Sequence, residues 1–110
     1  MGDIKVILWT IPDSNPNDVR QLIDTIRRKT DSVAMMFAVV VGEGKVQLLS
    51  AFSKDLVEKK FNAVDWIKEI CPLIGGSGGG GRPDLGQAGG KDADKIPEAF
   101  AAAKKWLEGR

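Results

Sequence analysis

The segment that decides how this chain is interpreted is Gly75–Gly90, GGSGGGGRPDLGQAGG, which holds nine of the 13 glycines. By composition, its first half also suits a flexible linker, which is the main alternative. A linker has no use, however, for Arg82-Pro83-Asp84 or for the second glycine pair, Gly89-Gly90. Ordering such a backbone costs on the order of 1–2 kcal/mol per residue. We therefore expect the glycines to serve close approach to a phosphate, a sugar edge or another backbone.

Known phosphate-binding loops do not account for this segment. Gly76–Gly81 formally satisfies G-x-G-x-x-G, but it follows a predicted helix, whereas the dinucleotide-binding motif follows a strand. A Walker A motif fails at Gly90-Lys91, because Leu85 replaces its leading glycine and Asp92 its Ser/Thr. Both interpretations are rejected.

The flanking sequence predicts strands and helices in a mixed order. Apolar, β-rich runs predict three strands, Ile4–Ile11, Val33–Val41 and Val46–Phe52, the last two forming a hairpin. Helical spacing and capping residues predict four helices: one from the Asn15-Pro16 start to Thr30, a short one over Lys54–Lys60 after the cap Ser53, one over Asn62–Cys71 limited by Pro72, and one over Lys95–Glu108.

The order predicts an α/β (α+β) fold: a small mixed sheet of about three or four strands with helices packed on it, and a Gly-rich loop between the last two helices. Periodicity does not decide whether part of that loop adds a strand. Residues 1–110 are expected to form a single domain, cut from a longer chain, with Met1-Gly2 an added start. Trp9, Trp66 and Trp106 are expected in the core, whereas Phe61 is a better candidate for exposure.

Composition excludes several classes of function. Hydrophobic residues make up 43% of the chain and charged residues 28%, which is typical of a soluble globular protein, and no apolar run is long enough to span a membrane. There is no histidine, and the single cysteine, Cys71, is expected to be buried near a helix end. Histidine-dependent catalysis, an internal disulfide and a Cys/His zinc site are therefore excluded, and a cytoplasmic location is expected. The net charge of +1 gives little support to strong, sequence-blind nucleic-acid binding.

The combination of a glycine run, Arg82-Pro83-Asp84 and Gln87-Ala88-Gly89-Gly90-Lys91 resembles the C-terminal domain (C-Ala) of bacterial-type alanyl-tRNA synthetases, a DHHA1-type domain also found in DHH-type phosphodiesterases. The order of the hairpin, the segment Ser53–Leu56 and the closing helix fits the same family. Two positions depart from its pattern. Ser77 interrupts the glycine run, and Gly86 replaces the usual alanine, which predicts a looser backbone there.

The resemblance implies a tRNA-binding domain that is not itself an enzyme. It would contact the elbow of tRNA(Ala) and help the aminoacylation and editing modules of a parent alanine–tRNA ligase share one tRNA. The parent would use ATP, Mg and Zn, whereas this domain needs no cofactor. Candidate RNA-binding residues are Gly78, Gly79, Gly80, Gly81, Arg82, Gln87 and Lys91, with Arg27 and Arg28 as secondary contacts.

Each candidate has a structural alternative. Arg82 could pair with Asp84 or another nearby carboxylate, and Arg27 and Arg28 could lie on a solvated helix face. The rival functions are the substrate-gripping domain of a DHH-type phosphodiesterase and a dimerisation or interaction domain. The phosphodiesterase domains typically carry a histidine where this chain has Arg82. A freestanding editing protein remains open as the parent. We expect the fragment to be mainly monomeric, with the other synthetase domains as partners and no membrane contact.

Overall fold

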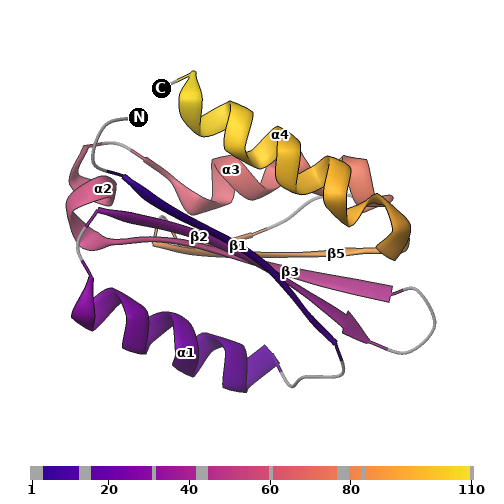
Figure 1. Cartoon of the computed structure of the whole chain (residues 1–110), viewed down its shortest axis with the longest axis horizontal. Coiled ribbons are helices and arrows are strands. Elements are labelled where there is room, and N and C mark those ends of the chain that lie inside the picture. Colours follow the sequence, from indigo (N-terminus) through magenta and orange to yellow (C-terminus); the bar gives the residue numbers. More distant parts are fainter. Residues whose placement is uncertain are drawn as a thin grey trace.

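The computed structural model describes residues 4–12, 16–30, 32–41, 45–59, 61–76, 80–82 and 84–109. Five strands and four α-helices are described there (Figure 1). In chain order they are β1 (Lys5–Pro12), α1 (Pro16–Lys29), β2 (Val33–Val41), β3 (Lys45–Phe52), α2 (Lys54–Glu58), α3 (Ala63–Ile70), β4 (Gly80–Arg82), β5 (Leu85–Gly90) and α4 (Ile96–Glu108). Two short 3₁₀ helices, η1 (Cys71–Ile74) and η2 (Ala93–Lys95), precede the glycine segment and α4.

The strands form one mixed sheet in the order β1-β2-β3-β5-β4. β1 runs parallel to β2, and the other neighbouring pairs are antiparallel. The predicted fold class and the hairpin of β2 with β3 are confirmed. The sheet has five strands instead of the expected three or four, because part of the glycine segment between α3 and α4 forms β4 and β5, a point that periodicity did not decide. Glycine has no side chain, so these strands lack the alternation by which strands are recognised in a sequence.

Helices cover both faces of the sheet (Figure 1). α1 packs on β2 and β3 from one side, and α3 and α4 lie on the other. The core between the sheet and α3–α4 centres on Trp66, which stacks on Phe52 with ring centroids 5.0 Å apart and donates from Nε1 to the carbonyl of Ala103. Cys71 is buried in this core, as expected, and burial raises the pKa of its thiol.

Two predictions about aromatic residues are wrong. Trp9 is 63% exposed, because β1 is an edge strand and α1 packs over β2 and β3 instead. Phe61 was the better candidate for exposure than the tryptophans, but it is partly buried, with its ring 5.4 Å from that of Phe52, whereas Trp9 is exposed. The expected core positions of Trp66 and Trp106 are confirmed, the latter partly buried and stacked on Trp66.

A polar corner fixes the start of β2 to the start of α2. Ser53 precedes α2, as predicted, but its hydroxyl makes no capping bond to the helix. That hydroxyl instead donates to the carboxylate of Asp55 and accepts from the backbone N–H of Val33. Ser32 donates to Asp55 from its backbone and from its hydroxyl. These donors lower the pKa of Asp55 well below its usual value.

In the part of the chain that the structure describes, no helix combines the length and apolarity needed to cross a membrane.

Candidate functional site

The glycine-rich segment is a hairpin at one edge of the sheet. β4 pairs with β5 at Gly80↔Gln87, Gly81↔Gly86 and Arg82↔Leu85, and the other side of β5 pairs with β3. For the described residues, the flexible-linker alternative is therefore wrong. The hairpin presents the candidate residues on a sheet rather than on a free loop.

Several of its glycines are required by close packing of the backbone on itself. A Cβ on Gly76 would lie 2.1 Å from the carbonyl oxygen of Gly89, far inside van der Waals contact. Gly81 has a φ of +130°, which side chains rarely adopt, and a Cβ there would lie 2.3 Å from the carbonyl oxygen of Leu85. These glycines allow one part of the segment to pack against another.

Gly86, expected to lie in a looser backbone, is instead buried in a tight one. A Cβ on Gly86 would lie 2.8 Å from both the carbonyl oxygen of Ala63 and the hydroxyl oxygen of Ser50. The Ser50 hydroxyl donates to that same carbonyl, so β3, β5 and α3 meet at this point. The prediction is wrong because the missing side chain admits α3 to the sheet instead of freeing the strand.

Two glycines have no such structural reason. Among the described residues, Gly80 has no heavy atom within 4 Å of the place where its Cβ would be, and for Gly89 the nearest is the carbonyl oxygen of Val46 at 3.9 Å. Both residues are exposed, and neither has a φ in the left-handed region. The fold itself would accept a side chain at either position.

Two arginines on α1, Arg20 and Arg27, contact the hairpin, and the sequence did not predict these contacts. Arg20 donates from Nη2 to Oε1 of Gln87 on β5. Arg27 donates to the backbone carbonyl and to the carboxylate of Asp84, the latter 3.1 Å away, and also pairs with Asp24. The side chain of Arg27 is only 17% exposed, so much of its charge is used inside the domain.

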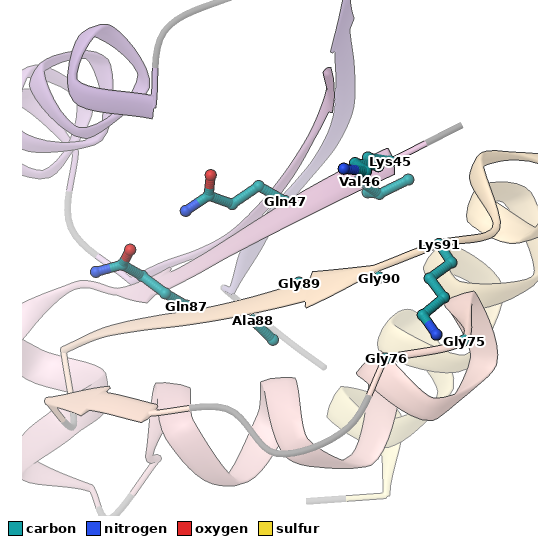
Figure 2. Close-up of a pocket in the computed structure, with 10 residues that line it drawn as sticks. All are labelled: Lys45, Val46, Gln47, Gly75, Gly76, Gln87, Ala88, Gly89, Gly90 and Lys91. Carbon is teal, nitrogen blue, oxygen red and sulfur yellow. The ribbon is translucent and has the colours of Figure 1, made fainter. Parts of the chain in front are cut away.

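A groove of about 680 Å³ opens where the ends of β3 and β5 meet the segment after η1 (Figure 2). Its polar side chains are Lys45 and Gln47 from β3, Gln87 from β5, and Lys91 just after β5. Its remaining described lining consists of small or apolar residues: Val46, Gly75, Gly76, Ala88, Gly89 and Gly90. Both lysines are exposed, and none of these described lining residues carries a carboxylate. The groove can therefore offer hydrogen-bond donors and positive charge to a ligand.

The structure brings some of the predicted RNA-binding residues together. Gln87 and Lys91 share the groove, and Gly80 pairs with Gln87 across the hairpin. Gly81 and the backbone of Arg82 complete β4; the side chain of Arg82 is not described, and Gly78 and Gly79 lie outside the described residues.

The secondary candidates, Arg27 and Arg28, lie on α1 and not in the hairpin. Arg27 is engaged by carboxylates, and Arg28 is exposed on α1. Their contact with RNA stays a prediction, as does that of the primary candidates.

Sequence reasoning missed the contributions of Lys45, Gln47, Gly89 and Arg20. The first two reach the groove only because β3 pairs with β5, and a glycine strand gives no periodic signal for that pairing. Within the described chain, no group of three or more His, Cys, Asp or Glu residues is placed to hold a metal ion.

Comparison with known proteins places this geometry in a family. The DHHA1 domain model matches residues 3–109. The alanine–tRNA ligase of Rhodopirellula baltica is 43% identical over 107 residues, covering 97% of this chain and 11% of that protein. The ligase of Ligilactobacillus salivarius is 47% identical over 94 residues, covering 86% and 11%. The chain thus spans about a tenth of the length of these curated relatives.

A solved structure matches nearly the whole chain. The C-Ala domain from the alanyl-tRNA synthetase of Aquifex aeolicus superimposes with a TM-score of 0.84 at 35% sequence identity, covering 94% of this chain and 91% of that one. The sheet with its glycine hairpin and the sequence relationship agree: the chain belongs to the DHHA1 domain family and is a relative of the C-Ala domain of alanyl-tRNA synthetases.

Proposed function

We propose that this domain binds tRNA through the β4–β5 hairpin and is the non-catalytic, tRNA-holding module of an alanine–tRNA ligase. The observation that carries the proposal is the match over nearly the whole chain to the C-Ala domain of an alanyl-tRNA synthetase. The named relatives favour this interpretation over the phosphodiesterase alternative. The ordered hairpin supports it physically, because it presents exposed glycine backbone at a sheet edge, where a sugar–phosphate chain can come close.

Recognition in this proposal depends on shape more than on charge. The net charge of +1 allows few phosphates to be neutralised. Backbone N–H groups of the glycine run and the forked guanidinium of Arg82 would contact phosphate or 2′-hydroxyl oxygens at the elbow of tRNA(Ala). The domain would need no cofactor for this, and ATP, Mg and Zn would serve the rest of a cytoplasmic parent.

In the parent, the domain would hold one tRNA for both the aminoacylation and the editing modules. Those other synthetase domains are the expected protein partners, and the fragment alone is expected to be mainly monomeric. Because binding is the proposed activity, it can be tested on this chain without the parent.

The test compares intact tRNA(Ala) with an acceptor minihelix that lacks the elbow, for the unaltered chain and for Arg82→Ala, at low and moderate salt. We expect preference for intact tRNA, and a loss of about tenfold or more in affinity with Arg82→Ala, as for a specific arginine contact. Lys104→Ala is the matched control, since Lys104 is an exposed cation on α4, on the face of the sheet opposite α1. Equal binding of both RNAs, or no effect of Arg82→Ala, would contradict elbow recognition by this segment.

A further inference from the structure

Gly89 lines the groove at a position where the fold does not require a glycine. Gly89 is exposed, lies directly across from Gln47 in the β3–β5 pairing, and shares its strand face with Gln87 two residues earlier. Figure 2 shows the two glutamine side chains extending to the same side of the sheet, while Ala88 points away from it. A side chain at position 89 would thus enter the groove beside both amides without striking any described residue, since the nearest described atom to its Cβ would be 3.9 Å away.

The amide of Gln87 has a fixed orientation. A guanidinium group carries donors and no acceptor, so the atom of Gln87 that meets Arg20 must be its carbonyl oxygen. The NH₂ group of Gln87 is thereby left as the part of the amide that can face a ligand. Arg20 thus determines that Gln87 offers donors.

The charged side chains that line the groove also favour a ligand rich in hydrogen-bond acceptors. Lys45 marks the β3 side, and Figure 2 shows Lys91 extending beside Gly75 on the other. Asp92 lies near Gly75 as well, with Oδ2 2.7 Å from where a Cβ on Gly75 would be, but it is not among the described lining residues. Two cations and an oriented donor suit an acceptor-rich, anionic ligand. The volume, about 680 Å³, lies in the range of roughly 300–1,000 Å³ that ligand sites occupy.

We propose that this groove binds a segment of the RNA sugar–phosphate backbone, with Gly89 as the point of closest approach, the NH₂ of Gln87 as a donor to the RNA, and Arg20 as a positioning residue. This inference rests on the proposed tRNA-binding function and adds a second contact region beside the hairpin edge that carries Arg82. Lys45 and Lys91 neutralise phosphates at the two sides of the groove.

The first test uses one methyl group. Gly89→Ala should weaken binding of intact tRNA(Ala) by about tenfold, because the methyl holds the RNA away from the strand, while the melting temperature stays the same or rises. Gly109→Ala is the matched control: its Cβ would also find only ordinary contacts, at 3.6 Å and beyond, but at the end of α4. Unchanged affinity of Gly89→Ala would overturn the groove proposal.

The second test replaces the donor of Gln87 with a negative charge while keeping its contact with Arg20. Gln87→Glu keeps an acceptor for Arg20 but replaces the donor with a negative charge in the groove. Affinity should fall by tenfold or more with no loss of stability, and undiminished affinity would contradict the proposal. Lys45→Gln and Lys91→Gln should each reduce the slope of log affinity against log salt by about one. Slopes unchanged in both would contradict phosphate contact there.

The positioning role of Arg20 is tested by comparing its substitution with and without Gln87. Arg20→Gln should weaken binding in the unaltered chain but have no further effect in a Gln87→Ala background, whereas a direct contact of Arg20 with RNA would weaken both equally and overturn its positioning role.

The groove and the proposed function can fail separately. If Arg82→Ala weakens tRNA binding while Gly89→Ala and Gln87→Glu do not, the hairpin edge binds RNA and the groove does not. If none of the three variants changes the affinity, both proposals are wrong.

Discussion

Gly76→Ala is expected to destabilise the domain far more than Gly89→Ala, although the two glycines touch. A Cβ on Gly76 would lie 2.1 Å from the carbonyl oxygen of Gly89, whereas ordinary contact begins at 3.4 Å. The two backbone segments would therefore have to separate by the difference, about 1.3 Å. Neither segment can rotate away as a side chain would, because Gly76 donates to the carbonyl of Cys71 and Gly89 is paired with Gln47.

The expected loss follows from two opposing terms. Forcing an extra methyl into a packed site costs typically about 1–3 kcal/mol, and a collision with backbone belongs at the upper end. Replacing glycine with alanine also restricts the unfolded chain, which stabilises by about 0.4–1 kcal/mol where no strain arises. The net loss for Gly76→Ala is then about 2 kcal/mol, which lowers the melting temperature by about 10 °C. Gly89→Ala should gain the second term alone.

The assay is urea unfolding followed by circular dichroism, with both variants and the unaltered chain measured in parallel. The midpoint for Gly76→Ala should fall while the dependence on urea stays the same, since the surface exposed on unfolding hardly changes. Equal midpoints for the two variants would refute the close approach of these backbones and the reason given for the glycine at 76.

Substitutions at two further positions test the core and the polar corner. Trp66→Ala should cost about 3–5 kcal/mol in urea unfolding, because it empties the centre of the aromatic cluster. Trp66→Phe keeps an aromatic ring but loses the hydrogen bond to Ala103, so a loss of about 1 kcal/mol is expected. An equal loss for both variants would contradict the larger share given to the ring over the hydrogen bond. Asp55→Asn should lower stability at pH 7. Hydrogen bonds from Ser32 and Ser53 depress the pKa of Asp55 in the folded state, so the Asp55 carboxylate stabilises the fold at pH values above its pKa in the unfolded chain. The difference between Asp55→Asn and the unaltered chain should narrow as the pH falls below about 3.8, and a difference independent of pH would contradict the assignment.

The sequence predicts the elements whose side chains alternate or recur, and it fails where side chains are missing. Strands such as Val33–Val41, helices such as Ile96–Glu108 and the antiparallel pairing of β2 with β3 carry enough side-chain pattern and turn chemistry to be located. β5 contains only two apolar side chains, Leu85 and Ala88, so no period-2 pattern marks it as a strand.

The candidate site was only partly predictable for the same reason. Gln87 belongs to the glycine segment and Lys91 directly follows it, so both could be named from the sequence motif. Lys45 and Gln47 join them through the pairing of β3 with β5, and Arg20 through a contact from α1. Such contacts between residues distant in the chain depend on the register of the sheet, which the local pattern does not specify.

The two edges of the sheet differ in what they offer to another polypeptide. β4, at one edge, is three residues long and is followed by Pro83, features that discourage a foreign strand from extending the sheet there. β1, at the other edge, is eight residues long, largely apolar, and carries the exposed Trp9. Sheet extension by a neighbouring molecule at high concentration is thus favoured at β1. Because β2 separates β1 from the strands that line the groove, self-association there would bury Trp9 while leaving the groove accessible.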